Sequence, residues 1–160
     1  MKIVSWEELK KITDNAKKQG KKVVFTNGCF DIFHVGHLRY LQEAKKLGDI
    51  LVVAVNSDMS VKALKGPTRP INSEADRMEL LAGLLCVDFV TIFEETTAIN
   101  IVQYIKPDIY VKGGDIKPGK FAEYDTIMAY GGKVEIIPLS VTQSRGYSTT
   151  NIINKSKGAK

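Results

Sequence analysis

Two histidines, His34 and His37, flank a glycine, Gly36, where a predicted strand (23–26) leads into a predicted helix (36–47). At such a junction of an open parallel sheet, free backbone N–H groups and the helix dipole attract anions. Imidazoles add hydrogen-bond donors, and the glycine lets a ligand approach closely. A lone histidine would more often cap the helix or pack against the sheet. The pair around a glycine instead predicts a site for phosphoryl oxygens.

A second group of hydroxyls, Ser148, Thr149 and Thr150, follows Tyr147 and precedes an apolar stretch near the end of the chain. Ser148 alone would be an ordinary helix N-cap. Three consecutive hydroxyls at a helix N-terminus that follows the last predicted strand favour a second anion site.

Cations and glycines mark the remaining candidates. Lys65 lies in a Gly/Pro loop, and Arg77 lies on a predicted helix, where a guanidinium can grip two phosphate oxygens. Either side chain could simply be solvated. The segment 112–115, Lys-Gly-Gly-Asp, follows the fourth predicted strand, where ligands bind in α/β sheets, although it could be a plain turn. Asp31 is interpreted as a support for the histidine loop.

Short strands rich in Val and Ile alternate with helices, which predicts a Rossmann-like α/β fold with a doubly wound, parallel, five-stranded sheet and helices on both faces. We expect a single domain over 1–160, with an N-terminal helix over 5–19 and a catalytic core over about 21–154. The expected strands are 23–26, 50–55, 88–93, 109–111 and 134–137. After the first helix, three helices are expected at 36–47, 59–64 and 74–84. Three more are expected: one from Thr97 to 105, one that ends at 130, and one that begins behind the cap Ser148 and ends near 154.

Composition narrows the function classes. The chain is 44% hydrophobic and 26% charged, as in globular proteins, and it shows neither an apolar run long enough for a bilayer nor a signal core. We therefore expect a cytoplasmic protein with no membrane partner. Cys29 and Cys86 have no metal-ligand spacing and are interpreted as reduced. The net charge of +5 suits anionic nucleotides or sugar phosphates, and the scattered lysines without interleaved aromatics disfavour nucleic acid.

Several motifs together resemble one family: TNGCFDIFHVGH, AVNSD, LKGPTRPIN, DRMELL, PDIYVKGGD and GYSTTNII. They are similar to the cytidylyltransferase-like nucleotidyltransferases with an HxGH motif, and specifically to the branch of D-glycero-β-D-manno-heptose 1-phosphate adenylyltransferases, in a stand-alone form. The resemblance implies transfer of AMP from ATP to the sugar phosphate by direct in-line attack, with release of pyrophosphate and with Mg²⁺ carried by the triphosphate. It also implies a homodimer, because dimers are usual in the superfamily.

The resemblance assigns residue roles. His34, His37 and Lys65 would be catalytic, with no dedicated metal ligands. The expected nucleotide- and phosphate-binding residues are Thr26, Asn27, Gly28, Cys29, Phe30, Gly36, Arg77, Lys112, Gly113, Asp115, Tyr147, Ser148, Thr149 and Thr150.

Other functions stay open at this point. Glycerol-3-phosphate cytidylyltransferase would share the chemistry, and Arg145 near the hydroxyl loop is similar to an arginine there. A catalytically silent nucleotide-binding regulator belongs to a different class, and a turnover assay decides it. An NAD-binding oxidoreductase is disfavoured because no GxGxxG follows the first strand.

Overall fold

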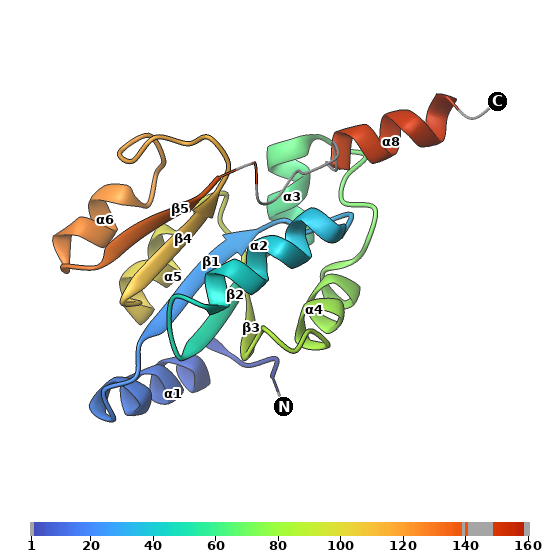
Figure 1. Cartoon of the computed structure of the whole chain (residues 1–160). Helices are drawn as coiled ribbons and strands as arrows, with labels where there is room; N and C mark the ends of the chain where they lie inside the picture. Colours follow the sequence, from blue (N-terminus) through green and yellow to red (C-terminus); the bar gives the residue numbers. More distant parts are fainter. Residues whose placement is uncertain (1, 139, 141–148, 159–160) are drawn as a thin grey trace.

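The computed structural model describes residues 2–138, 140 and 149–158 (Figure 1). Strands and helices alternate along the chain. In order they are α1 (Trp6–Lys18), β1 (Val23–Gly28), α2 (Val35–Lys45), β2 (Ile50–Asn56), α3 (Asp58–Lys65), α4 (Glu74–Ala82), β3 (Phe89–Phe93), α5 (Ile99–Ile105), β4 (Ile109–Gly113), α6 (Tyr124–Ala129), β5 (Lys133–Ile137) and α8 (Thr149–Gly158).

The five strands form one sheet in the order β3-β2-β1-β4-β5, and every pairing is parallel. The chain therefore builds the sheet outward from β1 to β3, then returns to the other side of β1 with β4. This reversal between β1 and β4 is a topological switch point, and their carboxyl ends flank the crevice where such sheets bind ligands. The Rossmann-like prediction is confirmed.

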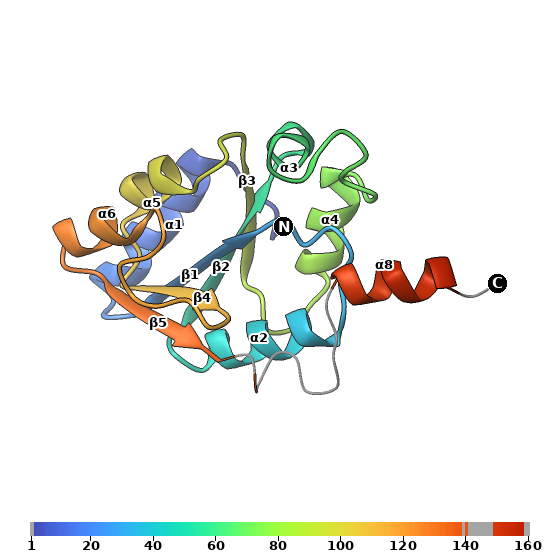
Figure 2. The same cartoon turned by 90° about the horizontal axis from the view of Figure 1, so that it is seen from above.

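Helices cover both faces of the sheet, as the view from above shows (Figure 2). One apolar core lies between the sheet and the side of α2 and α4, and it includes Leu41 and Leu81. The other lies between the sheet and α1, α5 and α6, and it includes Leu9, Ile101 and Ile127. Because both faces are buried, β1 and β2 read as continuous apolar runs rather than alternating ones.

Two strand ends reach further than the sequence predicts. β1 continues to Gly28 rather than 26, and β4 continues to Gly113 rather than 111. Both glycines keep their ladder pairing, with Val55 and Ile137 respectively. Pairing with the neighbouring strands thus overrides the low strand propensity of glycine. As a result, the first residues of the two predicted ligand-binding loops belong to β1 and β4.

Helix boundaries differ from the prediction by one or two residues, except at the end of the last helix. α5 begins at Ile99 behind Ala98, which makes no side-chain cap, so the prediction that Thr97 starts this helix is wrong. α8 runs to Gly158, beyond the expected end near 154. The predicted cap of this last helix, Ser148, lies outside the described residues.

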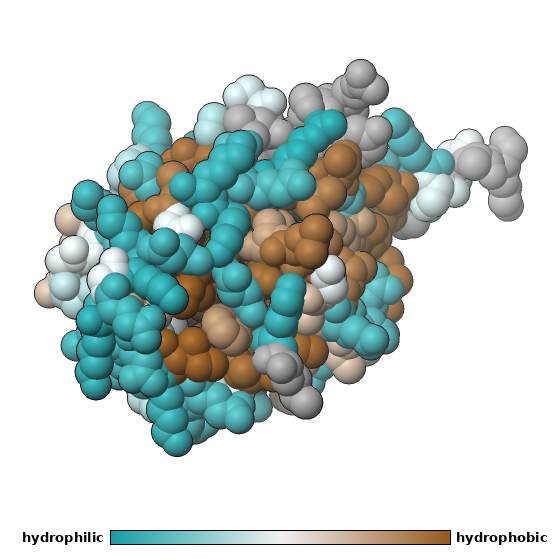
Figure 3. Space-filling model, turned by 60° about the horizontal axis from the view of Figure 1, so that its bottom comes forward, coloured by the Kyte–Doolittle hydropathy of each residue, from teal (hydrophilic) through white to brown (hydrophobic). Residues whose placement is uncertain are grey.

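Hydrophobic residues also reach the surface. On the face shown in Figure 3, hydrophilic residues surround several groups of hydrophobic ones. The most exposed large apolar side chains are Leu85, in the loop after α4, and Met59, on α3. None of the helices in the described ranges is both long and apolar enough to cross a bilayer.

Candidate active site

A cavity of about 350 Å³ opens at the switch point, at the carboxyl ends of β1 and β4 and the N-terminus of α2. Its wall combines backbone of the two strand ends with imidazoles, lysines and a hydroxyl. The lining residues are Asn27, Gly28, Cys29, Phe30, Asp31, His34, Gly36, His37, Tyr40, Lys65, Lys112, Gly113, Gly114, Ile116 and Thr149. The structure thus brings the two histidines, Lys65, the glycine loop after β4 and the start of α8 around one space.

The two imidazoles are stacked at the N-terminus of α2, with ring centroids 3.9 Å apart and an interplanar angle of 23°. His34 is the N-cap of this helix, and its Nδ1 accepts a hydrogen bond from the Gly36 N–H at 3.1 Å. Since Nδ1 accepts, a neutral His34 carries its proton on Nε2. The cap therefore fixes the tautomer that leaves a second donor for a ligand.

Both histidines favour the neutral form. Burial, followed by the positive charges of His34 and Lys65, lowers the pKa of His37 from 6.5 to about 4. Burial alone lowers the pKa of His34. His37 also packs edge-on against Phe30 at 5.3 Å between centroids, and its Nδ1 is buried without a hydrogen-bond partner within the described part of the chain. An anion bound in the cavity near His37 would favour the protonated imidazole.

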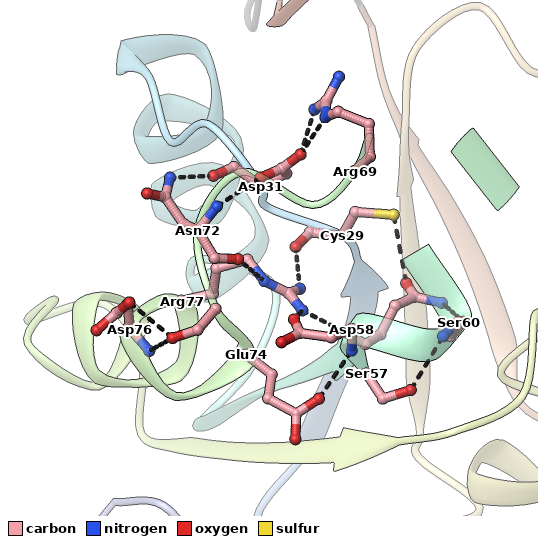
Figure 4. A network of polar contacts seen from close by, with 12 residues as sticks. Cys29, Asp31, Ser57, Asp58, Ser60, Arg69, Asn72, Glu74, Asp76 and Arg77 are labelled. Atoms are coloured by element: carbon pink, nitrogen blue, oxygen red, sulfur yellow. Dashed lines mark hydrogen bonds and ion pairs between the residues drawn. The ribbon is translucent and has the colours of Figure 1, made fainter. Parts of the chain in front are cut away.

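Asp31 fastens the histidine loop to the loop between α3 and α4 (Figure 4). The side chain is fully buried and forms an ion pair with Arg69, whose Nε donates to it at 2.5 Å. The backbone N–H groups of Ile71 and Asn72 donate to its other oxygen at 2.7 and 3.1 Å. Burial acts to raise the pKa of Asp31, but these hydrogen bonds and the guanidinium outweigh it, so the pKa is lowered. The carboxylate is fully used by protein donors, as its interpretation as a loop support requires.

Arg77 does not line the cavity. Its side chain is 1% exposed, and its guanidinium donates to the carbonyl oxygens of Asn72 (3.1 Å), Cys29 (2.5 Å) and Asn56 (2.8 Å) and to Asp58 Oδ1 at 2.8 Å (Figure 4). These acceptors come from the loop before α4, the loop after β1, the end of β2 and the start of α3. The structure therefore places Arg77 away from the cavity wall, and every nitrogen of its guanidinium already has a protein acceptor.

Thr26 and Asp115, both expected at the nucleotide, also lie off the cavity wall. The Thr26 hydroxyl is buried and shares a hydrogen bond of 2.7 Å with the Tyr40 hydroxyl, because Thr26 still belongs to the sheet. Asp115 is exposed in the loop after β4. Tyr147 and Ser148 lie outside the described residues, and the side chain of Thr150 is not described.

Lys112 reaches the cavity wall from the end of β4. Its ammonium lies 3.0 Å from the Tyr110 hydroxyl, 3.5 Å from Asn27 Oδ1 and 3.4 Å from Glu123 Oε2. Lys65, the last residue of α3, also lines the cavity; it is exposed and has no ion pair with any described residue. The cavity therefore holds one compensated and one uncompensated lysine.

The profile of the cytidylyltransferase-like family matches residues 25–155, which contain this whole cavity. The chain belongs to that family. It is 51% identical, over 96% of its length, to the bifunctional protein HldE of Haemophilus ducreyi, and 49% identical, over 96%, to HldE of Geobacter metallireducens. It spans 31% of the length of each of these relatives.

Two solved structures resemble this chain. The chain is 38% identical to the lipopolysaccharide core biosynthesis protein of Thermoplasma volcanium, with a TM-score of 0.61 over 74% of this chain and 96% of that one. A pantoate-β-alanine ligase of Francisella tularensis has the same TM-score at 15% identity, covering 98% of this chain and 77% of that one, and shares the fold.

Sequence reasoning missed three residues that line the cavity or contact its wall: Tyr40, Arg69 and Glu123. Tyr40 lies one helical turn after Gly36, so its position on the cavity side of α2 was open to prediction from the spacing. Its hydroxyl donates to the Val111 carbonyl at 2.9 Å and ties α2 to β4. Arg69 and Glu123 carried no local signal, because their partners Asp31 and Lys112 lie 38 and 11 residues away in the chain.

Proposed function

We propose that the chain transfers AMP from ATP to D-glycero-β-D-manno-heptose 1-phosphate and releases ADP-heptose and pyrophosphate. The observation that carries this proposal is the stacked His34–His37 pair at the N-terminus of α2, inside the switch-point cavity. The heptose motifs support the choice of sugar, as does the similarity to a protein named for lipopolysaccharide core biosynthesis.

The geometry supports a mechanism based on positioning and charge stabilisation. An oxygen of the sugar phosphate attacks the α-phosphorus in line, so that the new P–O bond forms as the bond to the pyrophosphate oxygen breaks. The phosphate is already anionic, and no general base is needed. His34 donates from Nε2, and His37 stabilises the negative oxygens at the α-phosphate. Lys65, whose charge is uncompensated, neutralises the triphosphate, and the start of α8 at Thr149 receives the leaving pyrophosphate.

The nucleotide enters as its Mg²⁺ complex in this proposal. Among the described residues, no three His, Cys, Asp or Glu side chains lie close enough together to hold a metal ion. Asp31, the carboxylate on the cavity wall, is used by protein donors. The fit is therefore to an ion held by phosphate oxygens and water, as Mg²⁺ prefers.

Arg77 and Asp31 act through the loops that they hold. Together they join the loop after β1, the end of β2 and the loop before α4 (Figure 4). We propose that this network fixes the position of His34 and Lys65 and that neither side chain binds phosphate.

Pyrophosphate release tests the proposed function. The assay pairs Mg·ATP, Mg·CTP or Mg·GTP with the β and α anomers of heptose 1-phosphate and with glycerol 3-phosphate. Release with ATP and the β-heptose phosphate alone is the expected result, and His37→Ala lowers it roughly 100-fold or more. Release with CTP and glycerol 3-phosphate would change the assigned substrates and leave the proposed mechanism as it is. No release with any pair, although nucleotide binds, refutes the proposed enzyme.

A further inference from the structure

Lys112 is held by a residue that does not line the cavity. Glu123 lies in the segment between β4 and α6, and its side chain is 4% exposed. Its Oε2 faces the Lys112 ammonium at 3.4 Å, and its Oε1 accepts a hydrogen bond from the Ala98 backbone N–H at 2.9 Å. One buried carboxylate thus joins the cavity wall to the start of α5.

Both contacts of Glu123 answer a physical requirement. Ala98 is the N-cap of α5 and has no side-chain oxygen, so Glu123 satisfies an N–H that the helix leaves open and places negative charge at the positive end of its dipole. The opposite charge of Lys112 compensates a carboxylate that would be costly to bury alone. Removing the charge of Glu123 therefore takes away the group that holds the Lys112 ammonium in place and compensates its charge.

Aromatic rings define the rest of the ammonium's surroundings. Lys112 Nζ lies 5.3 Å from the Tyr110 ring centroid and 5.5 Å from that of Phe121, and these two rings stack on each other. The Tyr110 hydroxyl donates to Asn27 Oδ1 at 2.5 Å and accepts from Lys112. Asn27 and Lys112 line the cavity together, so the orientation of both depends on where the ammonium is held.

We propose that Glu123 is a positioning residue of the nucleotidyl-transfer site. It fixes the Lys112 ammonium beside Asn27 and compensates its charge, so that Lys65 remains the uncompensated cation for phosphate. The link to catalysis rests on the proposed function, whereas the positioning itself is a property of the free protein and is measured separately.

Lysine reactivity tests the positioning without any substrate. The full chain is labelled with an amine-acylating reagent, and the rate at each lysine is read by mass spectrometry. In Glu123→Gln, the amide oxygen still accepts the hydrogen bond from the Ala98 N–H. The labelling rate of Lys112 is expected to rise about tenfold, a change within the range of interaction energies measured between contacting residues. Asp125→Asn, an exposed carboxylate two residues along, is the matched control and leaves Lys112 unchanged. An unchanged rate at Lys112 in Glu123→Gln overturns the proposal.

A double-mutant cycle on Mg·ATP binding tests whether Glu123 acts through Lys112. Glu123→Gln weakens binding about tenfold in the native background and has no further effect in Lys112→Gln. Equal losses in both backgrounds indicate a merely structural role and refute the proposal. If Glu123→Gln does not fold, Glu123→Asp replaces it in both experiments, because its charged group stops one methylene short of both partners and the same selective effects are expected.

The two proposals fail separately. If Lys112 becomes reactive in Glu123→Gln but the native chain neither binds Mg·ATP nor releases pyrophosphate, the proposed function is wrong and the positioning stands. If pyrophosphate is released by the native chain but Lys112 keeps its reactivity in Glu123→Gln, the positioning is wrong and the proposed function stands.

Discussion

Acidification should destabilise this protein through His37. Its pKa is 6.5 in the unfolded chain and about 4 in the folded protein, chiefly because the imidazole is buried. Between these values the unfolded state binds the additional proton. The contribution of neutral His37 is therefore complete above pH 6.5, declines as the pH falls, and is lost below about pH 4. At 1.36 kcal/mol per pH unit, the whole window corresponds to a loss of about 3 kcal/mol.

Urea unfolding at several pH values between 7 and 4 measures this loss. His37→Asn keeps a polar side chain of similar shape without a titrating group, so its free energy of unfolding falls by about 3 kcal/mol less over the same window. His34→Asn is the matched control, since His34 is less buried and its pKa is lowered by burial alone. Carboxylates contribute equally to all three proteins and cancel in the comparison.

The same prediction has a direct spectroscopic test. The chain contains two histidines, so an NMR titration gives two imidazole signals that the variants assign. The His37 signal moves with a midpoint near pH 4. A midpoint near 6.5, or an unchanged pH dependence in His37→Asn, refutes the reasoning that burial and the neighbouring charges keep this ring neutral.

Three further substitutions separate chemistry from support. Lys65→Ala lowers kcat roughly 100-fold and leaves Tm within about 2 °C, because the side chain is exposed; a normal rate in the pyrophosphate assay contradicts its assignment. Arg77→Lys loses most of a buried hydrogen-bond set and costs about 3 kcal/mol, which calorimetry detects as a Tm about 10 °C lower; an unchanged Tm contradicts the supporting role. Gly113→Ala weakens Mg·ATP binding about tenfold, measured by titration calorimetry, since the new Cβ would lie 3.1 Å from the Tyr40 ring in an already packed wall; native affinity contradicts this contact.

Local sequence patterns were sufficient to predict the fold, because the sequence of each strand and helix indicates its type. Apolar runs of Val and Ile marked the strands that are buried on both faces. In the structure, Ser5, Ser57 and Ser73 each cap a helix, and each side chain accepts an N–H of the first turn. The alternation of these elements then left a parallel sheet as the simplest arrangement.

Residue type was less informative for Arg77 and Thr26. An arginine and a threonine beside a phosphate motif have the chemistry to bind phosphate, and no feature of the sequence separates a ligand contact from a structural one. The structure shows that Arg77 is 2% exposed and Thr26 is fully buried, and that both side chains form hydrogen bonds with protein partners.

The sequence by itself determined where the two histidines lie in the fold. His34, Gly36 and His37 are close in the chain, and a strand followed by a helix is enough to place them at one helix N-terminus. The tertiary structure alone decided which distant side chains share or support that site. Lys112 meets Glu123, and Asp31 meets Arg69, through ion pairs whose partners the chain folding brings together. These pairs form only when the strands and their connecting loops assemble. The local spacing of residues in the sequence does not encode that assembly.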